Sequence, residues 1–183
     1  MMKRSLRAWP FLTILLLVTA SVAHAQLGTS TGTTTVNVTV AAEAALNITN
    51  GTTNLTSTGT NFTNYTGSTS LTYFIRTTQS TGAGTLTLKV TTDFAPTGGP
   101  SVATPPTAGD SLSYTCTVAA PGTACTGSQT SSTTASTSVG SFGADAHSNL
   151  AGNAASVSWA LTNDPKYKTG SYSATVTFTI SAT

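Results

Sequence analysis

Charged side chains are scarce in this sequence of 183 residues, in which Asp, Glu, Lys and Arg together make up 7%. About 25% is usual for soluble domains. Three of the seven cations, Lys3, Arg4 and Arg7, stand at the start, so the rest of the chain has four cations against five carboxylates and a net charge of −1. Such a chain has no basic surplus to attract nucleic acid or acidic lipid. We therefore expect no nucleic-acid partner.

Clusters of side chains suited to catalysis or metal binding are also lacking. The five carboxylates fall in five separate segments, and no pair is suited to glycoside hydrolysis. His147 lies near Asp145 in the sequence, but no nucleophile motif such as G-x-S-x-G accompanies them. Two cysteines and one histidine after residue 25 are too few ligands for a zinc site. We expect no enzyme activity, no cofactor and no metal.

The longest hydrophobic run is short and lies near the start of the sequence. It covers the 12 residues from Phe11 to Val22, whereas a membrane-spanning helix needs about 20. Basic residues precede the run, and Ala23–Ala25 follows it with small side chains, a pattern typical of a secretory signal peptide. We expect residues 1–25 to be removed and the mature chain, without a membrane span, to begin at Gln26. The expected location is extracellular or at the cell surface, reached through the periplasm in a bacterial host.

Alternation of apolar and polar residues replaces both charge and helical periodicity. Forty of the 42 threonines follow Ala25, and this β-branched residue suits the exposed face of a pleated sheet. A period of two recurs along the chain and indicates half-buried strands. The expected strands contain TVNVTV, ALNIT, SLTYFIRT, TLTLKVTT, SLSYTCTV, SVSWALT and YSATVTFTI.

These short strands predict an all-β fold, an antiparallel immunoglobulin-like (Ig-like) β-sandwich of about seven or eight strands with Trp159 in its core. Asn50-Gly51 predicts a hairpin turn, and the segments 95–110 and 126–138 are expected to be loops. The expected organisation is a signal peptide at 1–25, an N-terminal strand that is a possible donor strand at 26–42, and the sandwich at 43–183.

Two cysteines, Cys116 and Cys125, lie close together in the sequence. In an exported protein an even number of cysteines at short spacing predicts a disulfide. Closing a loop of this size stabilises a fold by roughly 2–3 kcal/mol on the chain-entropy estimate.

Two alternating segments near the ends of the sequence carry neither charge nor proline. One is 33–40, with Val36, Val38 and Val40 on one face, and the other is 172–180. Monomeric proteins usually protect edge strands with Lys, Pro or bulges. Unprotected strands can pair within one molecule or add to the sheet of another. A head-to-tail contact of the second kind does not close on itself and builds a filament.

The final segment resembles that of chaperone–usher fimbrial subunits and of the related spore coat protein U-like secreted domains. Gly170 is the fourteenth residue from the end, as in those families, and TTTVNVTVAAEAALNIT is similar to their N-terminal openings. Ala182 stands where chaperone–usher pilins usually have Tyr, and Ala45 and Leu46 lie where an early cysteine is common. The alternating apolar positions of the families are matched by Tyr172, Ala174, Val176, Phe178 and Ile180.

This resemblance implies an Ig-like sandwich in which a missing strand leaves a groove beside the final strand. A chaperone fills the groove first, and the N-terminal extension of the next subunit fills it later. By this resemblance Val36, Val38 and Val40 are donor residues, and the residues from Gly170 to Ile180 named above form the acceptor edge. The implied partners are copies of the chain or related subunits, with a periplasmic chaperone and an usher.

Two functions stay open at this point. The first is a secreted structural subunit of a fimbria-like or other extracellular surface polymer that assembles by β-strand donation. The second is a self-contained secreted Ig-like adhesin or carbohydrate-binding module whose first strand completes its own sheet. In the second case an exposed aromatic residue such as Tyr65 or Tyr167 would contact the ligand.

Overall fold

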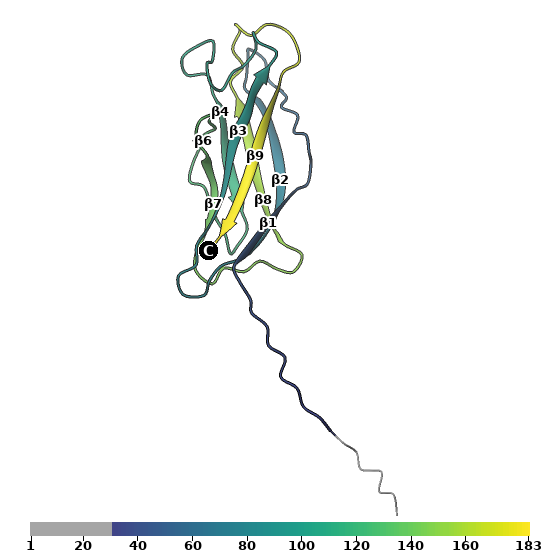
Figure 1. Ribbon diagram of the computed structural model, residues 1–183. Coiled ribbons are helices and arrows are strands. Elements are labelled where there is room, and N and C mark those ends of the chain that lie inside the picture. The colour runs from purple at the N-terminus through teal and green to yellow at the C-terminus, as the bar shows by residue number, and fades with distance from the viewer. Residues whose placement is uncertain (1–30) are drawn as a thin grey trace, which may run out of the picture. The chain divides into compact units, whose positions relative to one another are not determined.

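The computed structural model describes residues 31–183, and the predicted signal peptide lies outside the described residues. All regular secondary structure in this part is β, as predicted (Figure 1). Seven strands have six residues or more, and two further strands have only two residues each. The bounds are β1 Glu43–Ile48, β2 Tyr65–Arg76, β3 Gly84–Ala95, β4 Leu112–Val118, β5 Thr123–Ala124, β6 Gln129–Thr130, β7 Thr137–Phe142, β8 Asn153–Leu161 and β9 Ser173–Ala182.

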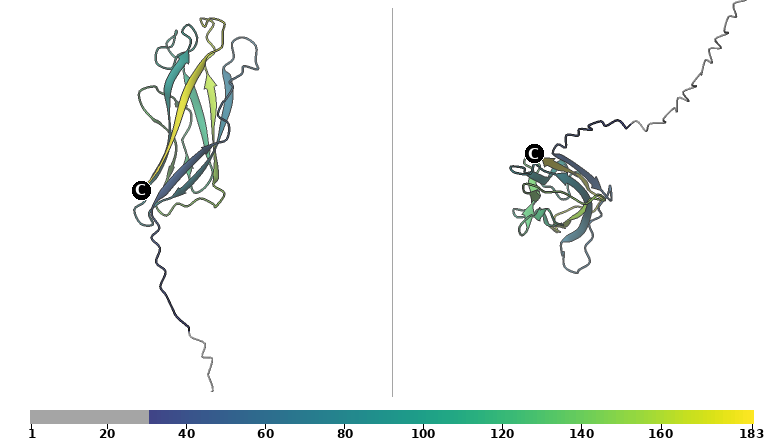
Figure 2. Two further views of the ribbon diagram at one scale, coloured as in Figure 1. Left: turned by 45° about the vertical axis from the view of Figure 1, so that its right-hand side comes forward. Right: turned by 90° about the horizontal axis from the view of Figure 1, so that it is seen from below.

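The strands form two antiparallel sheets that face each other as the layers of a sandwich (Figure 2). One sheet has the order β1-β2-β8-β4-β6, and the other has the order β5-β7-β3-β9. In an Ig constant-type domain strands A, B, E and D share one sheet, and C, F and G share the other. Strands β1, β2, β8 and β4 take the places of A, B, E and D, while β3 and β9 take those of C and F. The predicted Ig-like sandwich is confirmed.

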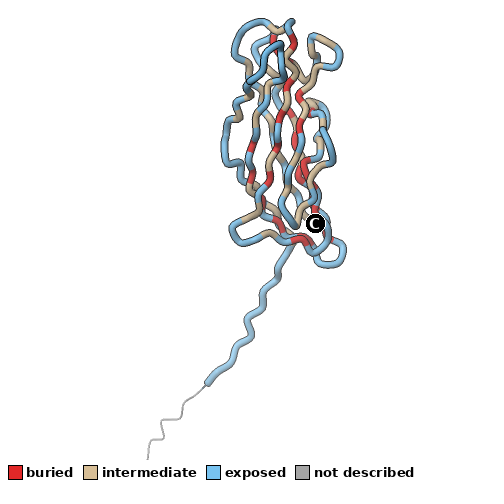
Figure 3. Tube along the Cα trace, turned by 180° about the vertical axis from the view of Figure 1, so that it is seen from behind, coloured by how far each residue is buried: buried red, intermediate tan, exposed pale blue. Residues whose placement is uncertain are grey.

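The core lies between the sheets and follows from the alternation in the sequence. Every second residue of the central strands is buried, and the residues between them face solvent (Figure 3). Fully burying one Leu, Val or Ile side chain stabilises a fold by about 1.5–3 kcal/mol. The buried residues on the strands are Leu71, Tyr73, Ile75, Leu86, Leu88, Val90, Leu112, Tyr114, Val139, Phe142, Ala155, Val157, Trp159 and Leu161.

Trp159 is buried in the core, as the sequence predicts. Its indole Nε1–H donates a hydrogen bond to Thr69 Oγ1 over 2.8 Å, so the buried polar atom is satisfied. Its ring lies 5.5 Å from that of Tyr114 at a tilt of 56°, a favourable aromatic arrangement. The Tyr114 hydroxyl lies 2.7 Å from Thr137 Oγ1 in β7 and donates to it, which ties the two sheets together.

The connection from β1 to β2 differs from the prediction. Asn50-Gly51 does not form a two-residue hairpin, because residues 49–64 separate the two strands. The chain instead runs on beside β2, where Thr56 and Thr66 exchange two backbone hydrogen bonds of 2.9 Å. Leu55 packs against the core from this segment. Partial burial of this side chain and pairing with β2 override the local turn signal.

One lateral side of the sandwich is closed by a covalent link, as predicted from the cysteine spacing. Cys116 belongs to β4 in the five-stranded sheet, and Cys125 directly follows β5 in the four-stranded sheet. The two form a disulfide, with their Cα atoms 5.6 Å apart. The N–H of Cys125 also donates to the carbonyl of Val139 over 2.9 Å. We call this side the closed seam.

Candidate strand-addition interface

The last strand, β9, lies at the edge of its sheet. It pairs with β3 on one side, and no strand within residues 31–183 pairs with its other side. Ser173–Ala182 contains neither a charged residue nor a proline. In an Ig domain strand G occupies this position beside strand F. The free edge of β9 is therefore a template of N–H and C=O groups for one more strand.

Apolar side chains lie along the side of the sandwich where β9 faces β1, the edge strand of the opposite sheet. β1 and β9 lie close to each other across this side of the sandwich, which we call the open seam. Ala44 and Leu46 of β1 pack against the core without being buried, and Ile48 is 39% exposed. The inward-facing residues of β9 are likewise only half-buried: Ala174, Val176, Phe178, Ile180 and Ala182.

Two of the predicted acceptor-edge residues precede β9. Tyr172 is half-buried, and its hydroxyl donates to the carbonyl of Lys168 over 2.8 Å. Its ring covers Gly99, where an added Cβ would come within 2.3 Å of a ring carbon. Gly170 lies in the exposed loop before the strand. The predicted acceptor edge therefore divides into four strand residues, from Ala174 to Ile180, and two residues at the entry to the strand.

The predicted donor segment forms no strand in this structure. Residues 31–42 pair with no strand in the described part of the chain. Val36, Val38 and Val40 are 86%, 83% and 62% exposed. Strand structure requires hydrogen bonds to a neighbour. The segment therefore exposes three apolar side chains at alternate positions.

The structure adds an anchor at the base of this segment that the sequence prediction missed. Arg76 Nε donates to the carbonyl of Ala41 over 2.8 Å, and its guanidinium lies 3.0 Å from the Glu43 carboxylate. Arg76 is the only arginine after residue 25, and Glu43 is the only glutamate in the sequence. The rarity of these two residue types was the only sign in the sequence that they could be paired. Their pairing across β1 and β2 is visible only in the fold. The anchor contacts the chain directly before β1 begins.

The Asp145–His147 pair does not show the geometry of a hydrolytic site. The His147 Nδ1 atom lies 3.8 Å from a carboxylate oxygen of Asp145, and both side chains are more than half exposed. No hydrogen bond joins His147 to a Ser or Thr hydroxyl within residues 31–183. Nor do these residues contain a group of three or more His, Cys, Asp or Glu placed to hold a metal ion. No helix in the described range is long and apolar enough to cross a membrane.

The aromatic residues do not gather into one exposed platform. Tyr73 and Trp159 belong to the core. The ring of Phe74 is on the outer face of the five-stranded sheet and 36% exposed. Three tyrosines are half-buried near the end of the sandwich where β9 begins, and they are Tyr65, Tyr167 and Tyr172.

A carboxylate pair at the same end of the sandwich was not predicted. Asp110 and Asp164 are brought together by two loops, and the Tyr167 hydroxyl donates to Asp110 over 3.2 Å. Burial, and then the neighbouring Asp164, raises the pKa of Asp110. Hydrogen bonds from the Thr107 hydroxyl and the Lys166 N–H lower the pKa of Asp164. The pair shapes the loops before β9, and its members are 54 positions apart in the sequence.

Comparisons with protein-family models, with curated proteins and with solved structures found no match to this chain.

Proposed function

We propose that the protein is a secreted structural subunit of a fimbria-like or other extracellular surface polymer, assembled by β-strand donation. Residues 33–40 of one copy enter the open seam of another copy and pair with the free edge of β9. Val36, Val38 and Val40 then cover the half-buried apolar residues of β1 and β9. A periplasmic chaperone and an usher are further partners in this proposal, because an unpaired edge with half-buried apolar side chains needs protection until assembly.

One observation carries the proposal: an unpaired, uncharged edge and an unpaired, uncharged segment of matching pattern occur in the same chain. β9 alternates half-buried apolar residues with exposed Ser and Thr. Residues 33–40 alternate exposed valines with Thr and Asn. Adding such a segment to an exposed edge is a known mode of recognition, in which the backbone supplies affinity and alternate side chains supply specificity.

The connection between the segment and β1 favours donation to another copy over return to the same molecule. To enter its own seam, the segment would have to reverse at Ala41–Ala42, directly before β1. Neither residue is a turn-former, and tight reversals favour Gly, Asn, Asp or Pro. The Arg76 hydrogen bond to Ala41 holds this backbone in its present course. A contact between copies needs no such reversal.

The test compares the mature chain from Gln26 with a chain that begins at Glu43. The full chain should form assemblies whose size rises with concentration in sedimentation velocity. The shortened chain should stay monomeric and bind a synthetic peptide of residues 33–40. The matched control is the same peptide with its three valines replaced by threonine, which keeps shape and β-propensity but removes apolar surface. It should bind at least ten-fold more weakly.

Two results would contradict the proposal. One is a full chain that stays monomeric at high concentration with the amide protons of residues 33–40 protected from exchange, which would show that the segment completes its own sheet. The other is a folded shortened chain that binds neither peptide. The first result would favour the self-contained binding module.

A further inference from the structure

The few charges of the mature chain are concentrated at the two ends of the sandwich. Lys89, in the middle of β3, is the only charged residue on the sheets between the two ends. The end at which β1 begins and β9 finishes, here the tail end, carries Glu43, Arg76, Asp145 and His147. The end at which β9 begins, here the loop end, carries Asp93, Asp110, Asp164, Lys166 and Lys168. Hydroxyl-bearing residues prevail on the faces between.

At the loop end the carboxylates accept hydrogen bonds within the molecule, whereas the two lysine ammonium groups form no ion pair within residues 31–183. Asp93 accepts hydrogen bonds from Ser101 and from backbone N–H groups of its own loop. Asp110 accepts from Tyr167, and Asp164 accepts from Thr107. Lys166 and Lys168 are exposed and form no ion pair within residues 31–183. The two lysine side chains are therefore the charged groups of this end that are left to form an ion pair with a partner.

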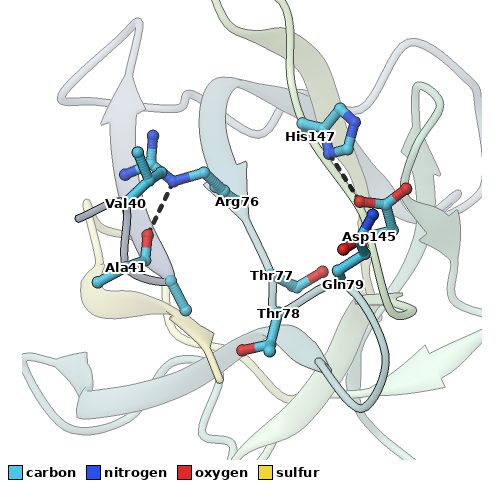
Figure 4. Close-up of a pocket in the computed structure, with 9 residues that line it drawn as sticks. Val40, Ala41, Arg76, Thr77, Thr78, Gln79, Asp145 and His147 are labelled. Carbon is cyan, nitrogen blue, oxygen red and sulfur yellow. Dashed lines mark hydrogen bonds and ion pairs between the residues drawn. The ribbon is translucent and has the colours of Figure 1, made fainter. Parts of the chain in front are cut away.

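The tail end presents a carboxylate beside a hollow. Arg76 neutralises Glu43, while Asp145 faces only the exposed His147 at 3.8 Å. The hollow has a volume of about 570 Å³. Figure 4 shows its lining, with Asp145 and His147 facing Arg76 and the base of the donor segment across Thr77 and Thr78. The carboxylate of Asp145 is thus available beside an open depression.

The direction of strand donation decides which ends meet. A donor strand parallel to β9 would emerge at the tail end of the acceptor, where the acceptor's own segment leaves β1. Tail ends of successive copies would then collide. β9 runs from the loop end to the tail end (Figure 1). An antiparallel donor therefore emerges at the loop end, so the tail end of each copy stacks on the loop end of the next. This arrangement repeats without conflict, and antiparallel pairing is also slightly the more stable per residue.

We infer that consecutive copies make a second, charged contact in addition to the donated strand. Lys166 and Lys168 at the loop end of one copy face Asp145 and the hollow at the tail end of the next. The partner is a second copy of this chain, and the contact sets the orientation of neighbouring copies. This inference rests on the proposed function, since strand donation is what brings the two ends together.

A double-mutant cycle in the full chain tests the contact. One variant is Asp145→Asn, chosen because Asp145 has a φ of 58° and Asn tolerates that conformation. A second variant carries both Lys166→Gln and Lys168→Gln. A third variant combines all three substitutions. Each should weaken assembly about two- to five-fold at low salt, the scale of exposed ion pairs. The combined variant should assemble no more weakly than the Asp145 variant or the double lysine variant, whichever assembles more weakly. All differences in assembly between the variants and the native chain should vanish at 0.5 M NaCl or above, where screening is strong.

The controls separate this inference from the proposed function. Lys89→Gln removes a cation away from both ends and should leave assembly unchanged. The 33–40 peptide lacks the body of a donor copy and cannot make the charged contact. Its binding to the shortened chain should therefore be unaffected by any of these changes. If the peptide binds but the cycle is additive or without effect, the charged contact is wrong and strand donation stands. If the peptide does not bind, both proposals fail.

Discussion

At the scale of single residues, Asp93 shows how one carboxylate organises a loop. Its two oxygens accept hydrogen bonds from the Ser101 hydroxyl at 2.6 Å and from the N–H groups of Phe94 and Val102 at 2.8 Å and of Ala103 at 3.2 Å. Burial alone would raise the pKa of Asp93, but these four donors outweigh it and hold the pKa below its usual value. The loop after β3 is thus pinned where β9 begins.

Replacing Asp93 with Asn should therefore destabilise the fold. The substitution removes the charge and presents an amide N–H₂ to a site built of donors, so we expect a loss of about 1–2 kcal/mol in the free energy of unfolding, allowing for partial exposure. Urea denaturation of the shortened chain at pH 7 measures it. Asp145→Asn is the matched control and should change stability by less than 0.5 kcal/mol, the usual range for surface substitutions.

The pH dependence of the same variant has a definite sign. Because the folded-state pKa of Asp93 is lowered, its contribution is complete above the unfolded-state pKa of about 3.9 and is lost as the pH falls through the folded value. The stability difference between the native chain and Asp93→Asn should be constant from pH 5 to 7 and should shrink below pH 4. A difference that stayed constant down to pH 2 would show that the charge is not what holds the loop.

At the scale of elements, the two lateral sides of the sandwich are built differently. The disulfide from Cys116 to Cys125 joins the sheets at the closed seam. At the open seam β1 and β9 meet only through half-buried apolar side chains. The covalent link therefore holds the two sheets together on the side away from the free edge. It can stabilise the sandwich without blocking the entry of another strand.

Removing the disulfide should weaken the fold and leave strand binding intact. For Cys116→Ser with Cys125→Ser we expect a loss of about 2–3 kcal/mol, from the size of the loop that the bond closes. The affinity for the 33–40 peptide should stay within two-fold of the native value under conditions in which both proteins are folded. Chemical reduction of the native chain should reproduce the loss of stability. A large fall in peptide affinity would show that the closed seam does control the groove.

The elements also show what could be read from the sequence. Alternation predicted six of the seven longer strands, because a half-buried strand leaves a period of two in the chain. It missed β7, which begins inside the predicted loop 126–138, and the predicted strand TVNVTV is unpaired. Asn50-Gly51 misled the prediction, since the burial of Leu55 and the pairing of Thr56 with Thr66 are tertiary effects. The edge position of β9 was predicted from the resemblance of the final segment to that of chaperone–usher fimbrial subunits. The contacts of Arg76 with Ala41 and Glu43 join residues that are 35 and 33 positions apart, so no local pattern reveals them.

At the scale of the whole molecule, β9 is an edge strand with no partner on one side within residues 31–183. The alternating segment 33–40 precedes β1, which begins at the tail end, and this segment is not paired. If an antiparallel strand belongs at this edge, it can equally follow β9 through a tight turn, because β9 finishes at the tail end. A hairpin partner would then occupy the seam within the same molecule.

This reasoning yields a last prediction, in which Asn-Gly and a copy of residues 33–40 are added after Thr183. A two-residue turn places the copies of Val36, Val38 and Val40 opposite Ile180, Phe178 and Val176, on the inward face. The fused chain should gain about 3 kcal/mol or more in stability from burying three valines. It should remain monomeric at concentrations where the native chain assembles, by sedimentation velocity. The same fusion with threonine at the three valine positions should gain little and still assemble. Equal behaviour of the two fusions would rule out the open seam as the site that a donated strand fills.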